Sequence, residues 1–379
     1  MVQEFTFGIE EEYFLSDAKR RDTARTGTRG FIEAAQAAFP DEVHPELLES
    51  QIEIATKPME TCEEARETLR RLRAGLATMA REHDLILSAV GTHPIAAWNR
   101  QRATPQRRYG RVMHDLQMVG SRHVVSGLHV HVALKDLERR IDVMNRILPY
   151  LPLLLALSTS SPFWQGKRTG LMSYRSAAAQ ELPRSGLPDL FGNAAEYERY
   201  VDTLVAARAI ENSSFLWWVI RPSLEHPTLE LRVADVCTRV EDGLAIAALY
   251  RCLVRHLARS PEVNRGLDGA SRAIVLENYW RAQRYGIHGS FVDEATRSAR
   301  PVADILDEVL AMVAEDSAAM GCEASLAATR DILARGTSAD RQLALFTDAI
   351  GRGVTPRDAL SEVVDWIGAE TAGGASARH

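Results

Sequence analysis

The stretch FTFGIEEEYFL (Phe5–Leu15) alternates between two kinds of side chain. Most of its large apolar residues fall on one face, and Glu10 and Glu12 fall on the other face beside Gly8. This period of two predicts a β-strand with one buried face. Two carboxylates one pleat repeat apart repel each other, which is tolerable when a divalent cation lies between them. The alternative is an edge strand with one solvated face. Glu11, alone on the apolar face, must be paired or lie at the rim of the sheet.

A second strand is predicted at residues 51–56, where Glu53 points away from Ile52 and Ile54. Glu46 comes just before this strand. Both carboxylates are candidate metal ligands, and the alternative is a group of surface acids around a turn.

A third strand is predicted at Val124–Leu134, with His129 and His131 on one face. Two imidazoles one pleat repeat apart point to the same site, where histidine serves as a metal ligand or an acid–base group. The spacing matches no zinc motif, and no cysteine is nearby. The alternative is a pair of hydrogen-bonded histidines near the core.

A fourth strand is predicted at Thr228–Val233, with Glu230 and Arg232 on one face. This pair suits a phosphate site, because a carboxylate holds metal and a guanidinium takes phosphate oxygens. The alternative is an ion pair on a solvated sheet, which contributes little to stability.

If these four faces converge, they form a site for divalent cations and a polyphosphate. The chain has no P-loop and no dinucleotide-binding glycine motif, so metal and basic residues on a sheet would have to hold a nucleotide. Two predicted loops, residues 93–111 and 162–175, carry further basic and aromatic residues. As candidates for binding a substrate carboxylate or an adenine ring we select Arg108, Tyr109, Arg168 and Arg175. Plain surface solvation is the alternative for each.

The composition indicates a globular enzyme rather than a protein that covers nucleic acid or an anionic membrane. The chain of 379 residues is 46% hydrophobic and has a net charge of -6. Its four cysteines show no CxxC pairing, so reduced buried thiols are expected. The N-terminus lacks a signal-peptide pattern, and the apolar stretch Ile147–Leu157 is too short to span a bilayer. We therefore expect a cytoplasmic protein with no nucleic-acid or membrane partner, and a homodimer remains open.

The predicted strands lie in the first two-thirds of the chain, and helical patterns dominate after Val240. This distribution predicts one α+β domain over residues 1–370, with an antiparallel or mixed sheet and a helical C-terminal third. Residues 371–379 are small and polar, and we expect them to be a disordered tail.

Five segments, in order, resemble the glutamate–cysteine ligase type 2 family of bacterial carboxylate–amine ligases. They are FGIEEEYFL, PELLESQIEIATKP, SGLHVHVAL, SSPFWQGKRTGLMSYR and RPSLEHPTLELRVADV. The resemblance extends through ENYWRAQRYGIHG, to about residue 290, and the helical end is less distinctive. It implies a glutamine-synthetase-like fold, in which a curved, mainly antiparallel sheet forms a funnel lined by acidic residues and helices pack outside.

The resemblance also implies roles for individual residues. Metal ligands or their neighbours would be Glu10, Glu12, Glu46, Glu53, His129 and Glu230. Arg232 would contact phosphate and stabilise charge during transfer, with Glu53 beside it in the catalytic set and His131 as a further cofactor contact. Glu46 stands where related ligases can carry Asp, so its role is less firmly implied.

The implied reaction uses ATP and two or more Mg²⁺ ions, with Mn²⁺ as a substitute. The γ-carboxylate of glutamate becomes an acyl phosphate, which an amine then attacks, with cysteine as the family's usual amine. Phosphoryl transfer of this kind depends mostly on positioning and charge neutralisation. A metal-dependent hydrolase, a non-catalytic ATP-binding regulator and a ligase for another amino acid or amine are the alternatives.

Overall fold

The computed structural model describes residues 4–373 and has at its centre a seven-stranded sheet of order β10-β11-β5-β1-β3-β2, with β4 also paired to β1. Every strand pair in this sheet is antiparallel. Its strands are β1 (Phe7–Asp17), β2 (Val43–Pro45), β3 (Gln51–Ala55), β4 (Leu85–Ser88), β5 (Gly127–Ala133), β10 (Ile220–Pro222) and β11 (Thr228–Asp235). The four strands expected to carry ionisable groups are therefore neighbours.

Three two-stranded ribbons lie outside this sheet. They are β6 (Phe163–Trp164) with β7 (Lys167–Arg168), β8 (Ser185–Gly186) with β9 (Trp217–Trp218), and β12 (Ser290–Asp293) with β13 (Ser298–Pro301). Only the β8–β9 pair is parallel among the strand pairs of residues 4–373. The expectation of an α+β fold with a mainly antiparallel sheet is confirmed.

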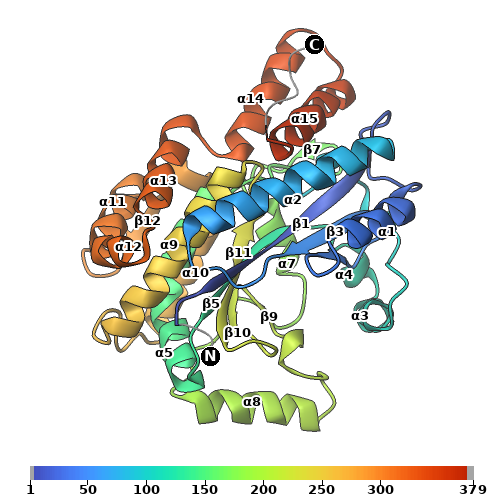
Figure 1. The fold of residues 1–379 in the computed structure, drawn as a ribbon. Helices are drawn as coiled ribbons and strands as arrows, with labels where there is room; N and C mark the ends of the chain where they lie inside the picture. The colour runs from blue at the N-terminus through green and yellow to red at the C-terminus, as the bar shows by residue number, and fades with distance from the viewer. Residues whose placement is uncertain (1–3, 374–379) are drawn as a thin grey trace.

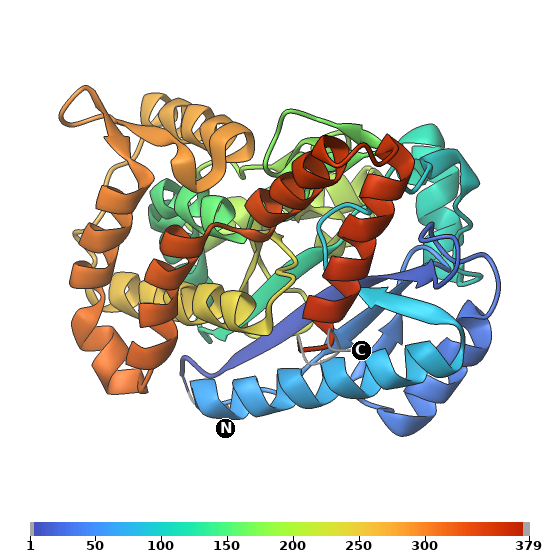
Figure 2. The ribbon, with the colours of Figure 1, turned by 90° about the horizontal axis from the view of Figure 1, so that it is seen from above.

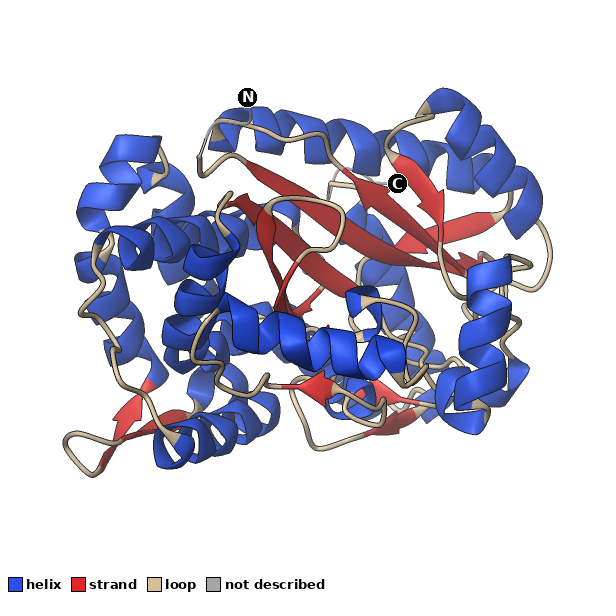
Figure 3. Ribbon diagram, turned by 90° about the horizontal axis from the view of Figure 1, so that it is seen from below, coloured by secondary structure: helices blue, strands red, loops and turns tan. Residues whose placement is uncertain are grey.

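Helices surround the sheet (Figures 1 and 3). Those before Val240 are α1 (Thr28–Ala38), α2 (Cys62–Glu82), α3 (Arg107–Leu116), α4 (Met118–Ser121), α5 (Leu137–Ile147), α6 (Leu151–Ser158), α7 (Tyr174–Ala179) and α8 (Ala194–Ala206). Those after it are α9 (Val240–Arg259), α10 (Gly269–Tyr285), α11 (Val302–Met312), α12 (Ala314–Met320), α13 (Glu323–Arg335), α14 (Ser338–Gly351) and α15 (Pro356–Thr371). Short 3₁₀ turns are η1 (Trp98–Arg100), η2 (Leu148–Tyr150), η3 (Ser213–Phe215) and η4 (Gly286–His288).

The long helix α2 shows why the apolar face of β1 is buried. The Thr61 side chain accepts a hydrogen bond of 3.1 Å from the backbone N–H of Glu64 and so caps the helix. Leu69, Leu72 and Leu76 recur at helical spacing and are fully buried. They share one core with the apolar side chains of β1, so α2 lies along one face of the sheet beside α9 (Figures 1 and 2).

The lone acid on this buried face is paired. Glu11 is completely buried, and its carboxylate accepts hydrogen bonds of 2.9 and 2.6 Å from Nε and Nη2 of Arg73 on α2. Arg73 also donates to the backbone carbonyls of Cys237 and Thr238. Glu11 therefore ties β1 to α2 and to the turn before α9, and it faces away from Glu10 and Glu12.

Two predicted loops contain regular structure. Residues 93–111 hold η1 and the start of α3, which the sequence pattern missed because its exposed Arg residues hide a short amphipathic helix. Residues 162–175 form the β6–β7 ribbon and the start of α7, and the Ser173 side chain caps that helix by accepting a hydrogen bond from the backbone N–H of Ser176.

The first residue of the expected disordered tail, Thr371, belongs to a helix instead. Helix α15 continues to Thr371, whose buried hydroxyl accepts a 2.9 Å hydrogen bond from the backbone N–H of Ala89. Residues 374–379, the rest of the expected tail, lie outside the described residues.

The segment Leu137–Ser158 is long and apolar enough to cross a membrane by length and composition alone. It is interrupted by η2, and 78% of its apolar window is buried inside the fold. All eight residues of α6 are buried, which is typical of a core helix and agrees with the expectation for Ile147–Leu157.

Candidate active site

The register of the sheet brings the predicted ionisable residues into one row. Glu12 is the direct cross-strand partner of Glu53, and Glu10 is the partner of His129. On the next pair of strands His131 lies opposite Glu230. Because direct partners project from the same face of an antiparallel sheet, these side chains share the face turned away from α2. The predicted convergence is confirmed.

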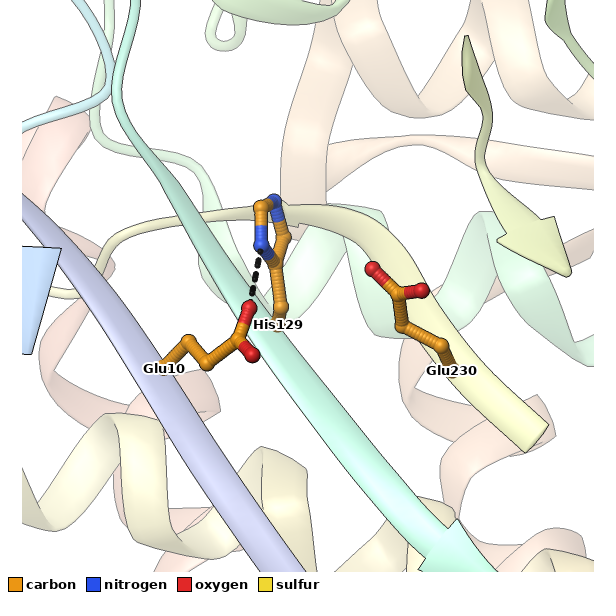
Figure 4. Close-up of side chains that lie close together, drawn as sticks. All are labelled: Glu10, His129 and Glu230. Atoms are coloured by element: carbon orange, nitrogen blue, oxygen red, sulfur yellow. Dashed lines mark hydrogen bonds and ion pairs between the residues drawn. The ribbon is translucent and has the colours of Figure 1, made fainter. Parts of the chain in front are cut away.

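His129 lies at the centre of this row. Its Nδ1 is 3.2 Å from Oε2 of Glu10 (Figure 4), and its Nε2 is 3.7 Å from Oε1 of Glu12. The imidazole is 3% exposed, and Nε2 has no hydrogen-bond partner among residues 4–373. Burial and the neighbouring Arg232 lower the pKa of His129, which favours the neutral imidazole. Neutral imidazole is the form that binds metal ions.

Two groups of side chains could each hold a cation, and both include His129. One comprises Glu10, His129 and Glu230, and the other comprises Glu12, Glu53 and His129. Within each group the ligand atoms lie within 4.8 Å of one another. Carboxylate oxygens with one imidazole nitrogen are a donor set for divalent cations, so the residues fit the expected metal ions.

The charges around these groups are strongly coupled. Burial, with Glu10, Glu46 and Glu12 close by, raises the pKa of Glu53 well above its ordinary value. Burial also acts to raise the pKa of Glu10, but hydrogen bonds from His129 and His131 outweigh it and lower that pKa. A buried carboxylate facing other carboxylates needs either a proton or a cation.

His131 is tied to the same carboxylate. Its Nε2 is 3.2 Å from Oε1 of Glu10, and its Nδ1 is 2.9 Å from the hydroxyl of Thr228. Burial acts to lower the pKa of His131, but Glu10 and Glu230 outweigh it and raise that pKa. His131 is absent from both candidate metal groups and contacts the ligand Glu10 instead.

Glu230 is held by two guanidinium groups. Arg221 on β10 donates to it from Nε at 2.8 Å and from Nη2 at 3.3 Å, and Arg232 donates from Nη1. Burial opposes ionisation, but Arg232 and Arg221 outweigh it and hold the pKa of Glu230 well below its ordinary value. Sequence reasoning missed Arg221, although it opens the block RPSLEHPTLELRVADV that contains Glu230.

These residues line a cavity of about 310 Å³. Its floor is the ionisable row, and α3 supplies an apolar wall with Tyr109, Val112 and Leu116. Glu46 and Tyr109 both line it, and the Tyr109 hydroxyl donates a 3.0 Å hydrogen bond to the carbonyl of Pro45. Glu46 lies at the cavity but outside both candidate metal groups.

A second, smaller cavity of about 50 Å³ adjoins the first through Glu12, His129 and Arg232. Arg175 and His123 line it, and Arg175 Nε and His123 Nδ1 are both buried without hydrogen-bond partners. Burial, with Arg175 and Arg232, lowers the pKa of His123 to about 3. Sequence reasoning missed His123, because a single histidine before a strand carries no pattern.

Arg168, a further predicted substrate residue, is not brought into the site. Arg168 is exposed on the β6–β7 ribbon and lines neither cavity, because that ribbon folds back on itself. The side chain of Arg108 lies outside the described side chains.

The sequence profile of the glutamate–cysteine ligase family 2 matches residues 6–362. The chain belongs to this family. A protein of Rhodospirillum rubrum named "Putative glutamate--cysteine ligase 2" is 46% identical over 97% of this chain and 95% of its own. A protein of the same name from Ectopseudomonas mendocina is 43% identical over 97% of each chain. The resemblance drawn from the sequence blocks is confirmed.

Solved structures share the fold at low sequence identity. A glutamate–cysteine ligase from Francisella tularensis, in complex with AMP, gives a TM-score of 0.70 at 14% identity and covers 98% of this chain and 90% of its own. A bifunctional glutathione synthetase from Pasteurella multocida gives 0.67 at 14% identity, covering 97% of this chain and 53% of its own.

Proposed function

We propose that this protein is an ATP- and magnesium-dependent carboxylate–amine ligase that activates the γ-carboxylate of glutamate for attack by an amine. The observation that carries the proposal is the pair of carboxylate–imidazole groups that share His129 and lie beside Arg232. Family membership supports the ligase class, and the AMP bound by the Francisella enzyme supports an adenine nucleotide as cosubstrate.

The donor set fits two or more divalent cations. His129, whose neutral imidazole offers one free lone pair, would complete only one group at a time, so Glu10 and Glu230 would hold one cation and Glu12 and Glu53 another, with His129 as a ligand of either. Magnesium bound there would neutralise charge on the phosphates of ATP. The unpartnered Nε2 of His129 and the raised pKa of Glu53 support this use, because within residues 4–373 Nε2 makes no hydrogen bond and the nearby carboxylates outweigh Arg232 at Glu53.

Arg232 is the residue that we expect to stabilise charge on the transferred phosphoryl group. It is buried beside the metal groups, and its Nη1 lies 3.5 Å from Nδ1 of His129. Glu230 fixes its orientation from the same strand. A preorientated guanidinium in a site with little water stabilises developing negative charge without reorganisation.

The small cavity has the right charge for one carboxylate of the acid substrate. Arg175 is 8% exposed, and its Nη1 donates to the backbone carbonyl of Arg232 at 3.1 Å while Nε has no partner. His123, neutral and unpartnered at Nδ1, lies on the same wall. A carboxylate seated there would leave the rest of a dicarboxylic amino acid directed towards Glu12 and His129.

The amine would then attack the acyl phosphate on the side closed by α3. Val112 and Leu116 of that helix exclude water from part of the cavity, which protects an acyl phosphate from hydrolysis. Cysteine is the amine that the relatives' names indicate, and the partners of the protein would be small molecules.

A metal titration tests this proposal. We expect ADP release with glutamate and cysteine to stop in EDTA and to return with Mg²⁺ or Mn²⁺. Glu12→Gln removes a proposed ligand and should abolish the response to Mg²⁺, whereas the exposed Glu33→Gln should retain it. Activity that is indifferent to the chelator would overturn the metal assignment.

A further inference from the structure

Three of the four cysteines meet in the core although they are far apart in the sequence. Cys62 is the first residue of α2, Cys322 directly precedes α13, and Cys252 lies within α9. All three are buried and free, and Cys62 and Cys322 share the core behind the sheet with Phe7 and Ile9. The active-site row lies on the other face of β1.

Cys62 and Cys322 are in direct contact. Their Sγ atoms lie 3.2 Å apart across 260 residues of sequence. A disulfide bond is about 2.05 Å long, so the two sulfurs need to approach by only about 1 Å to bond. Cys252 is a further neighbour of Cys322. Cys237, in contrast, has its sulfur 3.8 Å from the carbonyl of Asp235 and forms no hydrogen bond with these thiols within residues 4–373.

The surroundings of Cys322 favour an oxidation of its thiol that is slow but selective for this site. The hydrogen bond with Cys252 and burial raise the pKa of the Cys322 thiol to about 11, so the thiolate is a minor form, and Nη1 of Arg251, 3.9 Å from the sulfur, stabilises it once it forms. Cys322 follows Gly321, an exposed residue with a φ of 62° at the end of α12. A local opening of this turn between α12 and α13 would expose the thiol without disturbing the sheet.

We propose that Cys62 and Cys322 form an oxidation site that closes to a reversible intramolecular disulfide, with a hydroperoxide as the oxidant. One thiolate attacks the O–O bond and becomes a sulfenic acid, and the second sulfur displaces the hydroxyl group as water. With hydrogen peroxide, two thiols and one peroxide give one disulfide and two waters. The sulfur atoms lose two electrons, which the peroxide oxygens gain.

The bond would join the start of α2 to the start of α13. Arg251, beside Cys322, also donates hydrogen bonds to the carbonyls of Phe5 at 2.6 Å and Glu60 at 2.9 Å, so the site lies where the chain leads into β1 and α2. A crosslink across so long a loop restricts the unfolded chain strongly. Oxidation should therefore stabilise the fold and leave the active-site face intact, independently of the proposed function.

Peptide mapping under non-reducing conditions tests the proposal. The intact protein is treated with hydrogen peroxide, alkylated, digested and analysed by mass spectrometry, with and without dithiothreitol. We expect a peptide that links Cys62 to Cys322, reversed by the reductant, in the native sequence and in the matched control Cys237→Ser. Sulfinic or sulfonic acids at separate cysteines, a Cys252–Cys322 link, or unreacted thiols would each overturn it.

Thermal unfolding provides a second readout. Peroxide treatment should raise the Tm of the native protein by at least about 5 °C, and dithiothreitol should reverse the shift. Cys322→Ser should lose the shift while Cys237→Ser retains it. A shift that persists in Cys322→Ser would contradict the assignment even if that variant folds less stably.

Discussion

Glu12 of β1 and Glu53 of β3 are direct cross-strand partners on the face of the sheet that carries the active site. Two like charges directly opposite each other destabilise a sheet unless something lies between them. Burial and three nearby carboxylates raise the pKa of Glu53. This pairing therefore destabilises the metal-free fold. A cation bound beside the two carboxylates would offset their repulsion, so the pair is suited to form one wall of a cation site.

Replacing Glu53 separates a metal role from a structural role. Glu53→Gln should abolish ligase activity, yet in EDTA its Tm should equal or exceed that of the native protein, because one buried carboxylate has been removed. Differential scanning calorimetry in EDTA measures this. A fall of several degrees would indicate that Glu53 holds the fold together rather than a cation.

The buried pair Glu11–Arg73 should behave in the opposite way. Arg73→Ala leaves the buried Glu11 carboxyl without its guanidinium partner and with the Tyr13 hydroxyl as a remaining donor, and we expect it to lower the free energy of unfolding by about 3–5 kcal/mol. Glu11→Ala should destabilise similarly, and the double variant should cost less than the sum. Urea titration of the three variants measures the coupling, and additive losses would argue against a tight pair.

Arg175 and Arg168 form a matched pair for testing the carboxylate pocket. Arg175→Gln should raise the KM for glutamate by about 10- to 100-fold, because a charged hydrogen bond is lost, with little change in the KM for ATP. Arg168→Gln should leave both constants nearly unchanged, since that side chain is exposed outside the cavities. If the two substitutions have equal effects on ADP release, the small cavity does not bind the carboxylate of glutamate.

The buried His93 leads us to expect that the fold loses stability in acid for a reason that does not involve the active site. Its Nδ1 accepts hydrogen bonds from the backbone N–H groups of Ile95 and Ala96, and burial lowers its pKa to about 4. The unfolded chain therefore binds more protons than the folded chain between pH 6.5 and about 4, so stability falls as the pH drops through this window.

The loss should reach about 3 kcal/mol at pH 4 relative to pH 7. His93→Gln should be less stable at pH 7 but should lose less on acidification. Urea unfolding at several pH values compares the two slopes. Parallel slopes would show that His93 does not titrate in this range.

The sequence pattern predicted the site better than it predicted the loops. Glu10, Glu53, His129 and Glu230 could be found because alternation assigns each to the polar face of a strand, and a sheet then aligns such faces. The order of the strands, which places β5 between β1 and β11, has no local signature.

Residues outside a periodic element could not be placed from the sequence: His123 was missed, and Arg175 was only one of several loop candidates. His123 and Arg175 come together only through the packing of β9 and α7 around the small cavity, and no spacing in the sequence records that contact. Arg168 follows a similar basic and aromatic pattern, yet the β6–β7 ribbon directs it to solvent. Composition alone could not tell these two arginines apart.

The row from Glu12 to Arg232 is proposed to support ATP-driven amide formation. Its most direct test is product analysis by mass spectrometry with ATP, Mg²⁺, glutamate and a panel of amines including cysteine, alongside ADP release. We predict one ADP and one phosphate for each γ-glutamyl amide, with a loss of about 10³-fold in Arg232→Ala. Nucleotide-independent hydrolysis, or no amide product with any amine, would contradict the account.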